Sequence, residues 1–304
     1  MSPTGWVFPV SMGILGAAIG SFLNVVVYRL PRPGMSVLLP RRSFCPSCKA
    51  GIAWWDNLPI VSFLVLRGRC RHCRSAISVR YVVVEALAAL FFGALTHRFA
   101  TERWSSSVTS YGELLQLLLC LTAELYLVSM TLVVTFIDFE HKIIPDAVTL
   151  PGILFGLLVS LVAPNLHEDS RFYQVLLQWD WSSPLCGFVA SLTGMLAGGI
   201  LVALVGFVGT KAFRQEAMGM GDVKYLAMAG AFVSLDGVLM VFFLGCILGA
   251  LFGLVHRVMT GQRSIPFGPY LSVGILLVLF WRTPVIEFFR QDWPRFVRQV
   301  LGLS

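Results

Sequence analysis

Charged residues are scarce in this chain of 304 residues: they make up 13% of it, whereas 57% of the residues are hydrophobic. A soluble globular protein carries about twice that share of charge. Apolar stretches run for 16 to 24 residues with few ionisable side chains, which is long enough to cross a bilayer. The scarcity of charge excludes a soluble domain, and the abundance of apolar residues excludes a disordered chain. The composition indicates a polytopic membrane protein.

The first apolar run lacks the basic segment that opens a signal peptide and the small-residue cleavage site that ends one, so we expect a retained span. The stretch 223–255 contains a turn signal, Ser234-Leu235-Asp236-Gly237, which indicates two crossings, the first of them short or tilted. The predicted fold class is therefore all-α, with about eight transmembrane helices. The six spans outside that stretch fall near residues 6–28, 81–96, 114–137, 148–163, 185–208 and 270–281.

Acidic residues are nearly missing from one long loop. Residues 29–80 hold ten Lys and Arg against one acid, Asp56, whereas the loop 164–184 holds one basic residue against three acids. Because basic loops stay in the cytoplasm, the loop 29–80 is predicted to be cytoplasmic and the N-terminus to lie outside. Eight crossings place the C-terminal tail outside, although its four Arg favour the inside. We interpret the net charge of +7 as this orientation signal, with membrane lipid and no nucleic acid as partner.

The seven cysteines are unevenly distributed, and four of them form two CxxC knuckles in the cytoplasmic loop. Twenty-one residues separate the knuckles, a spacing that lets four thiolates surround one zinc ion. Two disulfides are the alternative, which a reducing cytosol disfavours. Since protein would fill all four positions, the metal is expected to be structural, in a zinc-ribbon-like insertion. The predicted ligands are Cys45, Cys48, Cys70 and Cys73.

Two acids stand at predicted cytoplasmic ends of spans, where an unpaired carboxylate is costly. Asp138 follows an apolar run that ends at Ile137, and Asp222 opens another run after Gly219-Met220-Gly221. Two carboxylates brought together can share a proton, so that one activates water while the other polarises a peptide carbonyl. The alternative is that Asp222 caps its helix and Asp138 pairs with Lys142.

The order of several motifs resembles the prepilin peptidases of type IV pili and type II secretion, which are membrane aspartic proteases with a GxGD signature. The resemblance covers nearly the whole chain, and the joint order of the blocks makes it specific. Val82 departs from it, because the family usually has proline after the Arg-Tyr pair. Besides the cysteine knuckles, the matching blocks are GSFLNVVVYRLP (20–31), ISVRY (77–81) with Glu85, DFEHKIIPDAVTLP (138–151), GMGDVK (219–224) and IPFGP (265–269).

The resemblance implies that Asp138 and Asp222 are the catalytic pair of a prepilin peptidase in the bacterial inner membrane, with its active site on the cytoplasmic side. Asp146 competes with Asp138, but helix N-capping beside Pro145 explains it without chemistry. The substrates implied are prepilins and pseudopilins. Residues 101–304 are the expected peptidase core, and residues 1–100 the expected methyltransferase part.

The second activity that the resemblance implies is methylation of the new N-terminal amine with S-adenosylmethionine, although the sequence lacks a glycine-rich cofactor loop. The candidate donor-site residues lie at the end of the first span and the start of the second. For Glu85, pairing with Arg80 or Arg29 is the alternative role. The five candidates are Asn24, Tyr28, Arg29, Arg80 and Glu85.

Two other classes of protein compete with this interpretation. A proton-coupled transporter would place acids at successive depths of its spans, and here only Glu85 and Glu124 lie within spans. A structural assembly protein would not need a pair of acids at all. Both alternatives are therefore disfavoured by the positions of the acids.

Overall fold

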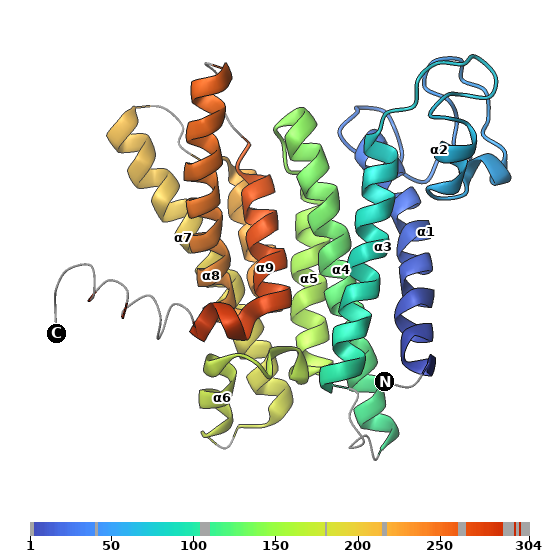
Figure 1. Cartoon of the computed structure of the whole chain (residues 1–304). Helices are drawn as coiled ribbons and strands as arrows, with labels where there is room; N and C mark the ends of the chain where they lie inside the picture. Colours follow the sequence, from blue (N-terminus) through green and yellow to red (C-terminus); the bar gives the residue numbers. More distant parts are fainter. Residues whose placement is uncertain are drawn as a thin grey trace. The chain divides into compact units, whose positions relative to one another are not determined.

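The computed structural model describes residues 3–39, 42–103, 110–179, 181–214, 218–260 and 266–287, with residues 295 and 298. Most of the C-terminal tail, and Ile265 of the IPFGP block, lie outside the described residues. The described chain is helical, and its only β pairing consists of two isolated bridges. It divides into two compact units, Met1–Val148 and Thr149–Ser304. Figure 1 labels the helices of both units.

Three long helices build the first unit: α1 (Val7–Arg29), α3 (Arg80–Arg98) and α4 (Tyr111–His141). Glycines let α1 and α3 approach closely. A Cβ atom on Gly16 would lie 2.6 Å from the carbonyl oxygen of Ala88, and one on Gly20 would lie 2.8 Å from the Cα of Glu85. Without a hydrophobic driving force between helices in lipid, such close contact is a principal source of their association.

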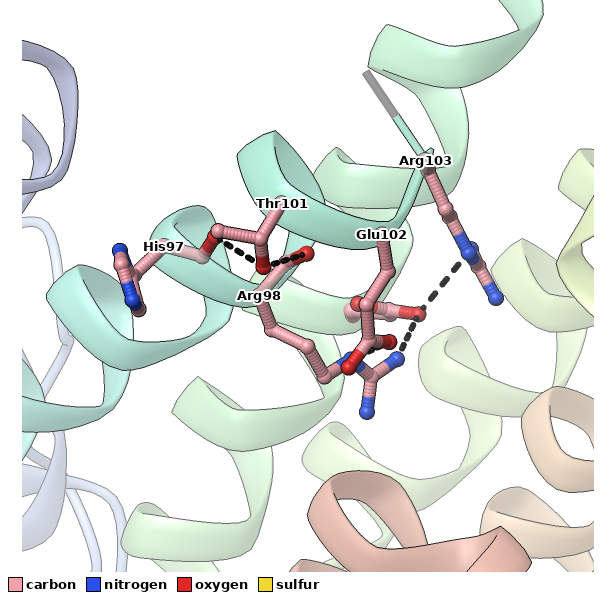
Figure 2. A network of polar contacts seen from close by, with 6 residues as sticks. His97, Arg98, Thr101, Glu102 and Arg103 are labelled. Carbon is pink, nitrogen blue, oxygen red and sulfur yellow. Dashed lines mark hydrogen bonds and ion pairs between the residues drawn. The ribbon is translucent and has the colours of Figure 1, made fainter. Parts of the chain in front are cut away.

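A buried ion network joins α3 to α4 at the end of α3 away from Arg80 (Figure 2). There α3 continues as a π-helical turn, Phe99–Arg103. Arg98 and Arg103 each approach one carboxylate oxygen of Glu124 at 3.3 Å, and the Glu124 residue is 5% exposed. Arg98 also pairs with Glu102 at 3.5 Å. These arginines explain why Glu124 can lie in an apolar helix without serving as a relay.

The loop between α1 and α3 has little regular structure. It holds the short helices η2 (Trp54–Asn57) and α2 (Val61–Val65) and two small hairpins. The bridges Phe44↔Gly51 and Arg69↔Ala76 close those hairpins, one around each CxxC knuckle. We call the described residues of this segment, 30–39 and 42–79, the four-cysteine loop.

The second unit contains most of α5 (Asp146–Val162), then η4 (Pro164–His167), α6 (Arg171–Leu177), α7 (Ser183–Phe213), α8 (Met220–Thr260) and α9 (Gly268–Glu287). Ser234 interrupts α8 with φ 60° and ψ −173°. The Tyr225 and Ser272 hydroxyls are 2.7 Å apart, and a Cβ on Gly245 would lie 2.9 Å from the Leu271 side chain. Positions 225 and 245 would be about 30 Å apart along a straight helix. Since both meet the same turn of α9, α8 folds back at Ser234.

The fold-back confirms the predicted interruption of the stretch 223–255. The two arms of α8 are residues 220–233 and 235–260. The first arm is about 21 Å long, which is shorter than the hydrocarbon core of a bilayer. Hydroxyl and carboxylate groups fasten the turn. Ser234 donates to Ser170 Oγ at 2.7 Å, and Ser170 donates to Asp236 Oδ1 at 2.5 Å.

Five helices are long and apolar enough to cross a membrane, and α8 with its two arms counts as one of them. Two shorter apolar helices, Asp146–Val162 and Gly268–Trp281, add to these. Counting both arms of α8, the described chain has eight apolar helical segments at the positions predicted from sequence. The all-α, polytopic membrane fold is thereby confirmed.

The first arm of α8 packs against α7 through paired glycines, which generates a test of the fold. A Cβ on Gly194 would lie 2.2 Å from the Gly230 carbonyl oxygen, whereas one on Gly199 would meet nothing closer than 3.5 Å. Gly194→Ala should therefore lower the free energy of unfolding by about 1–3 kcal/mol. Gly199→Ala should be neutral or stabilising, because alanine favours helix. Thermal unfolding of both variants in detergent measures this, and equal midpoints would contradict the packing described.

Candidate functional site

The four cysteines of the loop converge on one point, as predicted. Their sulfur atoms all lie within 4.8 Å of one another, and Cys45 Sγ is 3.8 Å from Cys73 Sγ. Tetrahedral zinc with Zn–S bonds of 2.3 Å requires sulfurs roughly 3.8 Å apart. The chemistry and spacing of these donors fit a metal ion with four thiolate ligands.

Each knuckle is a tight turn that ends in a residue with positive φ: Lys49 in the first and Arg74 in the second, both at 60°. The amide of Lys49 donates to the Cys45 carbonyl, and that of Arg74 to the Cys70 carbonyl. Hydrogen bonding from the Cys48 amide lowers the pKa of Cys45 to about 6. The Ser75 hydroxyl lowers the pKa of Cys73. These two shifts favour the thiolate form that binds metal, whereas desolvation and the neighbouring cysteines raise the pKa of Cys48 to about 11.

A bidentate ion pair between Arg71 and Asp56 holds the second knuckle against η2. Arg71 donates to Asp56 Oδ2 at 2.7 Å through Nε and to Oδ1 at 2.6 Å through Nη2. Hydrogen bonding to the Arg71 guanidinium lowers the pKa of the Asp56 carboxyl. The single acid of this basic loop therefore has a structural role, which the sequence analysis did not assign.

A cavity of about 410 Å³ lies between the four-cysteine loop and the adjoining ends of α1, α3 and α4. Its volume is typical of a small-molecule site. All five residues predicted for the methyl donor line it, although they come from two helices: Asn24, Tyr28, Arg29, Arg80 and Glu85.

The arginines of the cavity have partners other than Glu85. Arg80 Nη1 lies 2.5 Å from Glu140 Oε2, near the end of α4. Arg29 donates to the carbonyl oxygens of Ser36 and Val37 at 3.3 and 3.1 Å. Glu85 is in none of the ion pairs of the described residues, so the alternative of its pairing with Arg80 or Arg29 is not found.

Glu85 instead accepts a hydrogen bond from the backbone. The Ile60 amide donates to Glu85 Oε2 at 2.7 Å. Ile60 has φ 62° and ψ −49°, and the Val61 amide donates to the Pro59 carbonyl at 2.5 Å, which makes a γ-turn of the rare form with positive φ. A β-branched residue there is strained, and such strain persists only where the surroundings impose it.

Two residues that contact the predicted donor-site residues were not predicted from the sequence. Glu140 lines the cavity as the partner of Arg80, 60 positions away in the chain. Its proximity to Asp138 in the sequence was the only available signal. The γ-turn at Ile60 has no signature in the sequence, because an isoleucine in this conformation depends on its tertiary contacts.

The two predicted catalytic acids belong to different units. Asp138 lies in the last turn of α4 and is 5% exposed, and the Lys142 amide closes that turn by donating to its carbonyl oxygen. Asp222 is half-buried in the first turn of α8, and its Oδ2 accepts from the Gly219 amide at 3.2 Å. That bond is the capping contact weighed as an alternative for Asp222, and it occupies one carboxylate oxygen. Asp146 is exposed at the first position of α5.

Two family profiles match the chain. One, described as the bacterial peptidase A24 N-terminal domain, covers residues 14–99 and therefore α1, the four-cysteine loop and α3. The other, described as the type IV leader peptidase family, covers residues 125–254, which include Asp138 and Asp222. No solved structure matches the chain significantly.

Curated relatives align with most of the chain. A protein of Neisseria gonorrhoeae is 34% identical over 283 residues, 86% of this chain and 86% of its own length. One of Myxococcus xanthus is 36% identical over 86% of this chain and 66% of its own length, and one of Legionella pneumophila is 29% identical over 95% and 96%. All three are named prepilin leader peptidase/N-methyltransferase. With these matches along nearly its whole length, the chain belongs to the type IV leader peptidase family.

Proposed function

We propose that this protein cleaves the leader from type IV prepilins or pseudopilins at the cytoplasmic face of the bacterial inner membrane, and then methylates the new N-terminus. The observation that carries the proposal is the assembly of the five predicted donor-site residues around one cavity, beside the four-cysteine cluster. In the same unit, Asp138 lies on the final turn of the helix whose Glu140 reaches that cavity. The relatives named for both activities match both parts of the chain.

Cleavage is assigned to Asp138 and Asp222 acting on one peptide bond. One carboxylate removes a proton from water, and the other, protonated, hydrogen-bonds to the scissile carbonyl and polarises it. The apolar setting favours sharing a proton, because two adjacent carboxylates cannot both ionise cheaply there. A substrate whose apolar helix lies in the bilayer would present its cleavage site at the membrane edge, where both acids are predicted to stand.

Methyl transfer is assigned to the residues 1–100, with S-adenosylmethionine as the donor. The cavity fits such a molecule in size and chemistry. Tyr28 and Tyr81 offer aromatic faces for its adenine, and the Arg29 and Arg32 guanidiniums suit its carboxylate. When bound, the donor supplies an electrophilic methyl group. The protein's residues exclude water and orient the amine.

Zinc is the metal proposed for Cys45, Cys48, Cys70 and Cys73. Four thiolates leave no position for water, so its role is structural. The metal would fix both knuckles, and with them the wall of the cavity to which Cys45 and Cys70 contribute.

The aspartate pair predicts non-additive mutants. Asp138→Asn, Asp222→Asn and the double change should each reduce cleavage of a synthetic prepilin by about 10³-fold, since removing either member disables the unit. Asp146→Asn, at an exposed helix start, is the matched control and should retain most activity. Cleavage rates measured in detergent, on variants whose thermal stability is unchanged, test this prediction. Full cleavage by folded Asp138→Asn protein would overturn the assignment.

The metal site predicts about one zinc per chain in the purified protein. Cys45→Ser combined with Cys70→Ser should abolish metal binding and reduce methyl transfer far more than cleavage, because the thiolates shape the cavity. Cys120→Ala, which alters a buried cysteine on α4 outside the cluster, should keep the metal. Elemental analysis with both activity assays tests this. A double variant that retains stoichiometric zinc would refute the site.

A further inference from the structure

Two residues that line the cavity have buried hydrogen-bond acceptors without a cationic partner among the described residues. Glu85 is 8% exposed and makes no ion pair within the described residues. Asn24 is 1% exposed, and its Oδ1 is buried without a hydrogen-bond partner. A buried carboxylate without a cation and an orphaned amide oxygen are both costly, so each indicates a ligand that donates.

The orientation of Asn24 follows from its neighbour. Its Nδ2 donates to the Tyr81 carbonyl oxygen at 2.9 Å. Because a carbonyl can only accept, the amide nitrogen must face it and Oδ1 must face away. Tyr81 precedes Glu85 by one helical turn on α3, and both Asn24 and Glu85 line the cavity.

We propose that Asn24 Oδ1 and the Glu85 carboxylate form the subsite that holds the new α-ammonium group of the cleaved substrate. This inference rests on the proposed methyltransferase function and assigns two of its cavity residues to the amine acceptor instead of the methyl donor. An ammonium group supplies three N–H donors and the missing positive charge, which together satisfy both acceptors.

S-adenosylmethionine also has an α-ammonium group, so the substrate and the donor are both possible sources. The depth of the two acceptors in the membrane favours the substrate. Asn24 precedes Arg29 by five residues on α1, and Glu85 follows Arg80 by five residues on α3. Both acceptors therefore lie about 7.5 Å along their helices from the arginines that mark the helix ends. A substrate with its apolar helix in the bilayer reaches this level from the membrane side. The donor, a polar molecule of the cytosol, enters among the arginines and the four-cysteine loop.

The γ-turn at Ile60 fixes the carboxylate for this role. The Ile60 amide donates to Glu85 Oε2, and the Ser21 hydroxyl also hydrogen-bonds to the carboxylate, so the carboxylate is held in one orientation. Two carboxylate oxygens have about four acceptor sites, so the group can still accept from a ligand. A strained turn maintained against a buried carboxylate is typical of a preorganised binding site.

The test compares two peptides that carry the apolar mature N-terminus of a type IV pilin, one with a free α-amine and one acetylated. Zinc-bound, full-length protein in nanodiscs should bind the free-amine peptide about tenfold more tightly, since the ammonium makes charge-assisted hydrogen bonds. Glu85→Gln and Asn24→Leu should each reduce this preference towards one. Glu124→Gln, which neutralises a buried carboxylate outside the cavity, should keep it.

Two results would overturn the subsite. One is an unchanged preference in Glu85→Gln protein. The other is a loss of about tenfold in affinity for S-adenosylmethionine in Glu85→Gln protein while the peptide preference remains. That result would place the ammonium group of the donor at Glu85. Absence of methyl transfer by the wild-type protein would instead refute the proposed methyltransferase function, and is measured separately with radiolabelled donor.

Discussion

The convergence of four sulfur atoms is the interaction on which the first unit depends. The loop between α1 and α3 has two short helical turns and two isolated bridges, too little regular structure to hold a shape by itself. The cysteines bring its two hairpins together, and the Asp56–Arg71 ion pair holds the second hairpin against η2. A cavity beside the membrane helices exists because the loop is held in this way, and a metal bound by the thiolates would contribute folding free energy directly.

Glycine contacts set the positions of the helices that carry the chemistry. Close approach at Gly16 and Gly20 brings Asn24 of α1 to the same cavity as Glu85 of α3. In the second unit, Gly194 and Gly230 let α7 approach the first arm of α8, at whose start Asp222 lies. Side chains larger than glycine would separate these helices, so the same small residues serve packing and the placement of functional groups.

Local patterns predicted most of the architecture. Apolar length predicted the spans, the Ser234 turn signal predicted the fold-back of α8, and CxxC spacing predicted the sulfur cluster. The resemblance supplied the five cavity residues. Partners distant in sequence could not be predicted this way: Arg80 pairs with Glu140, and Glu85 bonds to the Ile60 amide instead of an arginine. These partners depend on which groups tertiary packing brings within hydrogen-bonding distance of each side chain. The functional division at residue 100 and the meeting of the two aspartates stay predictions.

The central claim is that Asp138 and Asp222 act on one peptide bond. A disulfide cross-link between positions 138 and 222 tests it most directly. Asp138→Cys and Asp222→Cys should be introduced into a chain that keeps its four zinc ligands and has alanine at Cys120, Cys186 and Cys246. Mild oxidation followed by mass spectrometry should reveal a disulfide between positions 138 and 222. Phe139→Cys paired with Asp222→Cys is the control and should form little, because the neighbouring side chain points about 100° away around the helix. Absence of the 138–222 disulfide, with both thiols reactive, would contradict the account.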